Sequence, residues 1–394
     1  MSRMIGTVSR GLRAPIICGG DDLVEIVTNC IIDAAKDGGY EVRDRDIVAM
    51  TESIVARSQE NYVTIDNIAT DVRNKFGGET VGIVFPILSR NRFSVCLTGI
   101  ARGAKKVVVM LSYPSDEVGN HLVSLDAIDA AGINPYSDVL DIKRYRECFG
   151  YEKHTFTGVD YVEYYEQLIR AEGADCEIIF ANDPRAILKH TDNVLCCDIH
   201  TRARTKRLLK AAGAKNVYGM DDIMSAPIDG SGYNERYGLL GSNKATDDKV
   251  KLFPRDCQKL VEDIQDRVLK ETGKLIEVMV YGDGAFKDPV GKIWELADPV
   301  VSPAYTKGLE GTPNELKLKY LADNDFAGLS GEALRAAIED KISHKDTKQE
   351  GQMGTTPRRL TDLIGSLCDL TSGSGDKGTP IVYIQGYFDN YTTE

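Results

Sequence analysis

The chain has 394 residues, enough for two domains or for one domain with a large insertion. Its 48 Lys and Arg residues against 60 Asp and Glu residues give a net charge of -12, so no general attraction draws it to nucleic acids or anionic membranes. No apolar run approaches the roughly 18–20 residues of a membrane-spanning helix, and the first residues lack the apolar core of a signal peptide. We therefore expect a soluble protein that binds neither nucleic acid nor membrane.

The nine cysteines indicate a reducing compartment. They are scattered singly apart from Cys196 and Cys197, and none has the C-x-x-C spacing of a zinc or redox site. The five histidines form no close pair of the His-x-x-x-His kind, so the sequence does not support a histidine metal site. We expect reduced, buried thiols and a cytoplasmic protein.

Residues 1–110 form the first part of a predicted core. Apolar spacing indicates helices near residues 23–34, 65–76 and 89–103 and strands at 46–50 and 80–87. The strand at 46–50 leads into polar residues, which are Thr51, Glu52 and Ser53, followed by Arg57, Ser58 and Gln59. Polar side chains at a strand end are a common place for ligand binding, and this stretch is the first candidate.

From about residue 107 the pattern changes to alternating strands and helices. Strands are predicted at 107–111, 176–181, 193–199 and 216–220, and helices at 160–171 and 201–212. Such alternation is typical of a parallel sheet flanked by helices. We therefore expect residues 111–235 to form an inserted α/β domain.

Residues 236–394 are expected to return to the core. Helices are predicted at 255–272, 313–322, 330–342 and 357–371, and strands at 277–280 and 379–384. The fold class that follows is α+β. It has a core of mixed sheets and helices in two parts, interrupted by an α/β insertion with a mainly parallel sheet.

Two acidic turns are candidates for a metal site. Asn243 and Asp247 stand four residues apart, and Asp283 follows the strand at 277–280. Mg²⁺ and Mn²⁺ prefer carboxylate and carbonyl oxygens and usually take one or two protein carboxylates. Asp247 and Asp283 together meet that need, although both patterns are also typical of ordinary surface turns.

A glycine-rich turn near the C-terminal end is a candidate for anion binding. Gly375, Asp376, Lys377 and Gly378 precede the last predicted strand, where successive backbone N–H groups and the lysine can hold a phosphate. Arg57, Ser58 and Gln59 can contribute to the same task. The sequence contains neither a Walker A motif nor a dinucleotide fingerprint after a strand, and a plain strand-entry loop explains the turn equally well. We expect the three turns to meet at one site.

Taken in order, these pieces resemble the coenzyme F-420 gamma-glutamyl ligases, enzymes that attach glutamate to the deazaflavin coenzyme. The family motif Ser-Lys-x-Glu-Gly corresponds to residues 57–60, Asn-x-x-x-Asp to residues 243–247, and Thr-Gly-Lys to residues 272–274. The motif Thr-Asp-Thr-Asn-Gly can be laid against residues 281–284 in two registers one residue apart. The C-terminal helix, glycine-rich turn, x-Pro and strand of the family are similar to residues 362–386.

The resemblance implies a GTP-dependent, or ATP-dependent, ligase of α+β fold that works as a homodimer on small-molecule substrates. A carboxylate would be activated by phosphoryl transfer and then attacked by the amine of glutamate. The metal-binding aspartates of the family carry over to Asp247 and Asp283, with Mg²⁺ or Mn²⁺ between them. The usual ligases lack the block at 111–235. Gln59 stands where the family has glutamate, unless a slip of one residue brings in Glu60, and Thr-Asp-Thr is not preserved. These departures leave the identity of the carboxylate open.

Two other functions remain open from the sequence. The chain can be a catalytically inactive protein that binds a nucleotide or metabolite and uses the α/β domain to sense a ligand or partner. It can also be a transferase whose active site lies in the α/β domain, at the strand ends near Asp198 and His200.

Overall fold

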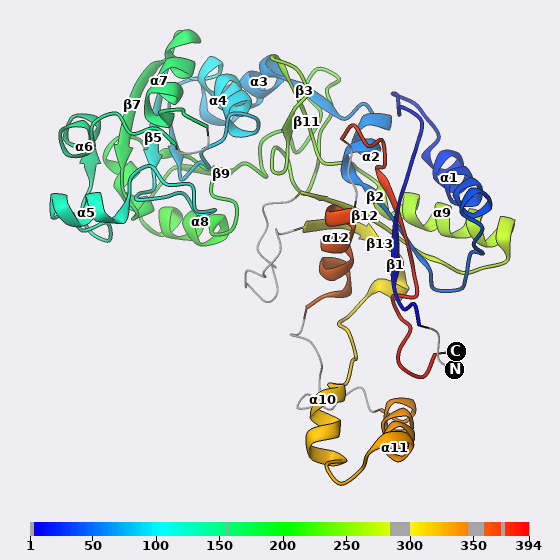
Figure 1. Ribbon diagram of the computed structural model, residues 1–394. Coiled ribbons are helices and arrows are strands. Elements are labelled where there is room, and N and C mark those ends of the chain that lie inside the picture. The colour runs from blue at the N-terminus through cyan, green and yellow to red at the C-terminus, as the bar shows by residue number, and fades with distance from the viewer. Residues whose placement is uncertain (1–3, 155–156, 284–299, 346–357, 372–374, 394) are drawn as a thin grey trace. The chain divides into compact units, whose positions relative to one another are not determined.

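The computed structural model describes residues 4–154, 157–283, 300–345, 358–371 and 375–393. These residues form three sheets with surrounding helices, which confirms the α+β class (Figure 1). Contacts between Cα atoms divide the chain into two units. The described part of unit 1 comes from residues 4–58, 256–283, 300–345, 358–371 and 375–393, and that of unit 2 from residues 59–154 and 157–255. The expected boundaries after residues 110 and 235 both fall inside unit 2.

Unit 1 is built on a five-stranded mixed sheet with the order β1-β14-β2-β12-β13. The strands are β1 (Val8–Leu12), β14 (Ile381–Gln385), β2 (Ile47–Thr51), β12 (Glu277–Asp283) and β13 (Val300–Tyr305). Only the neighbours β2 and β12 run parallel; the other neighbouring pairs are antiparallel. Met50 of β2 is opposite both Val280 of β12 and Ile381 of β14. The ends of β2 and β12 therefore lie beside the start of β14.

Helices cover both faces of this sheet because successive strand residues point to opposite sides. Val48 and Met50 pack with α1 (Leu23–Gly38) and α9 (Cys257–Thr272), whereas Ile47 and Ala49 pack with α12 (Leu360–Thr371). Figure 1 shows α1 and α9 together on one side of the strands and α12 on the other. The short helix α2 (Glu52–Ser58) follows β2 directly.

The other described helices of unit 1 lie between β13 and α12 in the chain. They are η2 (Lys307–Leu309), α10 (Leu318–Tyr320), the π-helical turn η3 (Leu321–Asp325) and α11 (Gly331–Ser343). The helix predicted over 313–322 is wrong in its first half. The carbonyl of Asn314 accepts a hydrogen bond from Lys345 Nζ rather than from a helical amide. The prediction of a helix at 330–342 is confirmed by α11.

Unit 2 contains a six-stranded sheet with the order β6-β7-β5-β4-β8-β9. The strands are β4 (Thr80–Val84), β5 (Lys106–Leu111), β6 (Leu140–Asp141), β7 (Asp175–Phe180), β8 (Asn193–Cys196) and β9 (Asn216–Gly219). All neighbours run parallel except β6, which pairs antiparallel with β7 at the edge. The predicted parallel sheet is confirmed. It begins earlier than expected, because β4 is hydrogen-bonded to both β5 and β8 and so belongs to this sheet rather than to the core.

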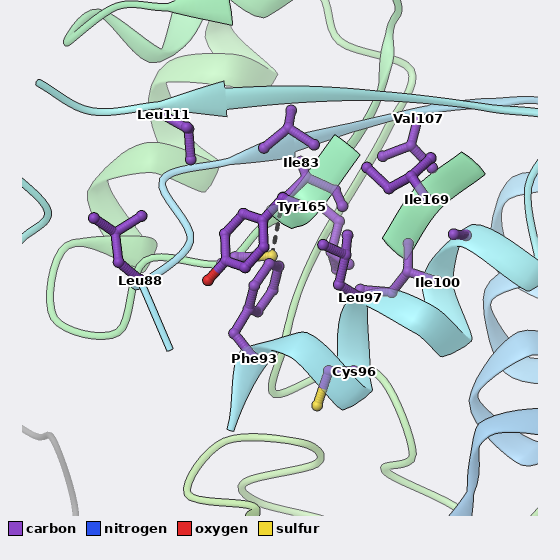
Figure 2. Packing of buried hydrophobic residues seen from close by; sticks show 14 of the residues in the cluster. Ile83, Leu88, Phe93, Cys96, Leu97, Ile100, Val107, Leu111, Tyr165 and Ile169 are labelled. Carbon is purple, nitrogen blue, oxygen red and sulfur yellow. Dashed lines mark hydrogen bonds between the residues drawn. The ribbon is translucent and has the colours of Figure 1, made fainter. Parts of the chain in front are cut away.

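Both faces of this sheet are covered as well. One face packs against α3 (Ile65–Phe76), α4 (Phe93–Arg102) and α7 (Tyr161–Ala171), together with α5 (Leu125–Ala131) and α6 (Ile142–Phe149). Figure 2 shows Ile83 and Val107 of the sheet facing Leu97, Ile100 and Tyr165 of the helices. The other face packs against η1 (Pro184–Lys189) and α8 (Arg202–Ala211). None of the described helices of the chain is long and apolar enough to cross a membrane.

A small three-stranded sheet completes unit 2. Its order is β10-β11-β3, with β10 (Asn243–Lys244), β11 (Lys249–Lys251) and β3 (Tyr62–Thr64). β10 and β11 form an antiparallel hairpin whose turn holds residues 245–248. The candidate residues Asn243 and Asp247 therefore belong to this hairpin.

Candidate active site

Three segments of unit 1 end or begin at one edge of its sheet, which we call the exit edge and define by Thr51, Asp283 and Pro380. Thr51 N donates to Pro380 O at 3.0 Å, and Thr51 is opposite Tyr281 in the parallel pair. The carboxyl ends of parallel strands, with the loops that follow them, are the usual place for ligand sites in α/β sheets. The hydroxyl of Thr51 is buried there and has no hydrogen-bond partner among the described residues.

Asp283 is the last residue of β12 and pairs with Val300 of β13. Its backbone therefore stands at the exit edge, as its position after an apolar strand predicts. The rest of its turn lies outside the described residues.

The turn of Gly375, Asp376, Lys377 and Gly378 leads to the exit edge through Pro380. All four of its residues are exposed, and Gly378 N donates to Gly375 O at 3.0 Å. Gly378 has a φ of 65°, a conformation that glycine adopts without strain. Ala14 N donates to Gly378 O at 3.1 Å, which ties the turn to the segment after β1. Two of the three predicted turns thus share one edge of the unit 1 sheet.

Arg57 and Ser58 lie at the end of α2, which starts at the exit edge. Arg57 is exposed, and its Nε donates to the carbonyl of Ile17. Ser58 Oγ donates to Val55 O at 2.9 Å, and Ser58 O accepts from Gly20 N at 2.8 Å. These contacts hold the loop before α1 against the end of α2.

Gln59 lies in unit 2, and its side chain is engaged with backbone. Its Nε2 donates to Arg255 O at 2.6 Å, and its Oε1 accepts from Arg255 N at 2.8 Å. This pair of hydrogen bonds holds together the first and last residues of the segment 59–255, which forms the described part of unit 2. Sequence spacing does not reveal these bonds because the two residues are far apart in the chain.

Asn243 and Asp247 also lie in unit 2. Asn243 is opposite Lys251 in the hairpin, and the side chain of Asp247 is 97% exposed and 2.6 Å from Lys244 Nζ. The described residues contain no group of three or more His, Cys, Asp or Glu side chains arranged to hold a metal ion. Metal binding by Asp247 and Asp283 stays a prediction.

Glu52 is the residue of the exit edge that sequence reasoning passed over. Glu52 belongs to the polar stretch after the strand at 46–50, but the sequence alone does not single it out from Thr51 and Ser53. Glu52 is only 5% exposed, which is rare for glutamate. The feature that could have drawn attention to Glu52 is its position, directly after the five buried residues of β2 and at the start of a helix.

Unit 2 has its own polar group at the carboxyl ends of β5 and β8. The Glu117 carboxylate accepts hydrogen bonds from the backbone amides of Ile199 and His200. Asp198 is fully buried, and its Oδ2 accepts from Thr201 Oγ1 at 2.7 Å. This is the region in which the sequence also allows the active site of a transferase.

Burial dominates the protonation of both acids. It raises the pKa of Glu117 to about 7; the nearby Asp198 and Asp116 carboxylates add to the rise, and the two backbone amides oppose it. Burial also raises the pKa of Asp198, against the hydroxyl groups of Thr205 and Thr201. A second charge in this group is therefore unfavourable near neutral pH.

This gives a pH-dependent contribution to stability. Because the folded pKa of Glu117 lies above its unfolded value, its contribution to stability is fully present below about pH 4.5 and is lost as the pH rises through about 7, by about 3 kcal/mol. We expect Glu117→Gln to remove most of this loss. Hydrogen exchange of the β8 peptide at pH 5 and pH 8 measures it. Equal pH slopes for the wild type and the variant would contradict the assignment.

Comparison with known proteins adds one strong match. A family model described as F420-0:gamma-glutamyl ligase matches residues 11–386, nearly the whole chain and including residues 111–235. No curated protein matches the chain. A chain in the crystal structure of the tetrameric eIF2B-beta2-delta2 complex from C. thermophilum matches 40% of this chain and 42% of its own length, with 14% identity and a TM-score of 0.22. That similarity is too low to bear on the fold.

Proposed function

The chain belongs to the F420-0:gamma-glutamyl ligase family, and from this premise we propose that it joins L-glutamate to a small carboxylate at the expense of GTP or ATP. The family match confirms the resemblance and makes the protein an amide-forming ligase. The exit edge of unit 1 is the site that we propose for this chemistry. The observation that carries the proposal is the shared position of Asp283, Thr51 and the glycine-rich turn on one sheet edge.

The proposed reaction has two steps. An oxygen of the substrate carboxylate attacks the γ-phosphorus of the nucleotide, and the nucleoside diphosphate leaves. The amine of glutamate then attacks the carbonyl carbon of the acyl phosphate, inorganic phosphate leaves, and the nitrogen loses a proton to give the amide. Both steps depend on positioning and charge neutralisation rather than on a protein nucleophile.

The residues of the exit edge fit a divalent cation in their chemistry. Carboxylate and hydroxyl oxygens are the ligands that Mg²⁺ and Mn²⁺ take, and the Thr51 hydroxyl has no protein partner among the described residues. Asp283 would hold the ion, which supplies charge neutralisation at the phosphates. Lys377 and the amides of the turn at residues 375–378 would face the phosphates. Arg57 and Ser58 of unit 1 would serve at the family-motif positions. Asn243, Asp247 and Gln59 belong to unit 2, and their part in binding stays a prediction from the sequence.

A homodimer in the cytoplasm is part of the same proposal. It is supported by the family resemblance and by the absence of a disulfide bond at any of the nine cysteines, all of which lie among the described residues.

Nucleotide binding is the direct test. We expect GTP or ATP to raise the melting temperature of the full chain only when Mg²⁺ or Mn²⁺ is present, because a ligand of the folded state stabilises it. Glutamate and a carboxylate acceptor, with F420-0 tried first, should then release phosphate. Binding without phosphate release from any acceptor would favour the inactive binding protein. No shift with GTP, GDP, ATP or ADP would overturn the proposal.

A further inference from the structure

An open groove runs between β1 and α1 in unit 1, and we call it the β1–α1 groove. It has a volume of about 730 Å³, which is in the usual range for small-molecule sites. One wall is β1 with the segment that follows it. The other wall is one face of α1, because the lining positions 26, 29, 30, 33, 34 and 37 keep helical spacing.

The charges of the groove differ in sign between its two ends. Arg13 precedes Ala14, whose amide holds the glycine-rich turn at Gly378, so Arg13 stands at the exit-edge end. Helix α1 starts after the loop that is held against α2 and ends before β2 begins. Asp33 and Asp37, in the second half of α1, therefore lie toward the opposite end.

These charges are not neutralised by strong internal partners. Arg13 and Asp37 are exposed, and neither side chain has a hydrogen bond or an ion pair with another described residue. Asp33 lies 3.7 Å from Lys36 Nζ, and the side chains of both residues are largely exposed, so this pair contributes little. The groove thus offers a cation at one end and two carboxylates toward the other to a molecule from solution.

Arg10 is fixed in the wall between these two ends. Its Nη1 donates to Gln385 Oε1 at 2.9 Å, and its guanidinium lies 4.2 Å from the centre of the Tyr40 ring. A guanidinium has five N–H donors, so this bond leaves donors for the carbonyl or carboxylate oxygens of a ligand. Arg10 is therefore held in place for hydrogen bonding along the groove.

The shape of the groove favours an extended ligand. Among the described strands, β1 pairs only with β14, so β1 is an edge of the sheet. Peptides in extended conformation commonly bind beside such an edge strand. Residues 26 and 37 of α1 are roughly 16 Å apart along the helix, which about three to five extended residues match.

We propose that the β1–α1 groove binds the carboxylate acceptor of the ligase, and that this acceptor is an extended zwitterion of the short-peptide class. Its carboxylate lies at Arg13 and its ammonium group at Asp33 and Asp37. The inference rests on the proposed function, because it names the class of acceptor for that reaction. The carboxylate at Arg13 is then the group that takes the γ-phosphoryl group beside the glycine-rich turn and forms the amide with glutamate.

Binding of trialanine to the full chain, measured by isothermal titration calorimetry, tests this inference. The side chains of trialanine are uncharged, so only its two termini carry charge. N-acetyl-trialanine lacks the ammonium group, and trialanine amide lacks the carboxylate. We expect each of them to bind at least about fivefold more weakly than trialanine, because each loses hydrogen bonds between charged groups.

Variants of the groove assign each terminus to its partner. In the double variant Asp33→Asn with Asp37→Asn, trialanine should bind at least about fivefold more weakly, and acetylation should have little further effect. In Arg13→Gln the same should hold for amidation. A purely structural role of these residues cannot produce this pairing of ligand and variant. Asp266→Asn is the matched control, since Asp266 is exposed on α9 and does not line the groove; its affinity for trialanine should be unchanged.

The outcomes separate the inference from the proposed function. No binding of trialanine, or equal effects of acetylation in the wild type and the aspartate variant, would overturn the inference. The proposed function would stand if GTP or ATP still raises the melting temperature with Mn²⁺. The expected pairing without addition of glutamate to trialanine would overturn its role as acceptor. The expected pairing together with a product of trialanine and glutamate, dependent on nucleotide and Mn²⁺, supports both.

Discussion

Replacing Asp283 by asparagine is expected to lower metal-dependent ligase turnover about a hundredfold or more. Asparagine keeps the size of the side chain but removes the charge that a divalent cation at the exit edge requires, and the loss of one electrostatic stabiliser of a transition state commonly has this magnitude. Steady-state phosphate release with GTP or ATP, glutamate and acceptor measures the effect. The change should appear mainly in kcat, because charge develops in the transition state.

Asp263→Asn is the control for this variant. Asp263 lies on α9 in unit 1, and its side chain is 42% exposed and 2.5 Å from Lys259 Nζ. Its removal should leave turnover unchanged, because exposed ion pairs on a helix contribute little. Equal turnover in Asp283→Asn and Asp263→Asn would remove Asp283 from the site.

Replacing Gly241 by alanine is expected to destabilise unit 2 by about 3 kcal/mol or more. Gly241 has a φ of 69°, and a Cβ there would lie 1.6 Å from the ring of Phe253, which is fully buried. The variant therefore combines backbone strain with overpacking. Chemical denaturation followed by far-ultraviolet circular dichroism, with hydrogen exchange of the β11 peptide to locate the change, measures the loss.

Gly213→Ala separates the two contributions. Gly213 has a φ of 92° but has open space around the position of a Cβ. This variant carries the backbone strain alone and should cost about 1 kcal/mol. Phe253→Leu in the Gly241→Ala background should restore part of the stability. Equal losses in Gly213→Ala and Gly241→Ala would show that contact with Phe253 is not the cause.

Sequence patterns predicted the elements whose signals are local. Helix α3 occupies the predicted residues 65–76, because its apolar residues keep helical spacing between the Thr64 cap and Gly77. Strand β4 was also predicted, but its place in the parallel sheet of unit 2 was not. A short apolar run indicates a strand without saying which strands will pair with it.

Strands that form only by pairing with a distant part of the chain could not be predicted from local sequence. β1 was missed, since Val8–Leu12 has few apolar residues, and it becomes a strand by pairing with β14 at the other end of the chain. β13 was missed as well, and it is held by pairing with β12. Both depend on tertiary contacts that no local pattern records.

The same limit applies to the site. The position of Asp283 at a strand exit follows from local pattern, as does the turn at residues 375–378, and both lie at the exit edge. Glu52 could not be selected, because the space beside Gly282 that its side chain fills exists only where β2 and β12 pair in parallel. The meeting of all three turns at one site stays a prediction, because the hairpin of Asn243 and Asp247 belongs to unit 2.

The measurement that tests the central claim most directly is formation of the amide product. The full chain is incubated with L-glutamate, GTP or ATP, Mn²⁺ and F420-0 or another small carboxylate, and the products are followed by mass spectrometry and phosphate release. We predict a product heavier by one glutamyl residue for each phosphate released, dependent on both nucleotide and metal. Absence of any glutamyl product with every acceptor, in a folded chain that also fails to bind nucleotide, would contradict the account.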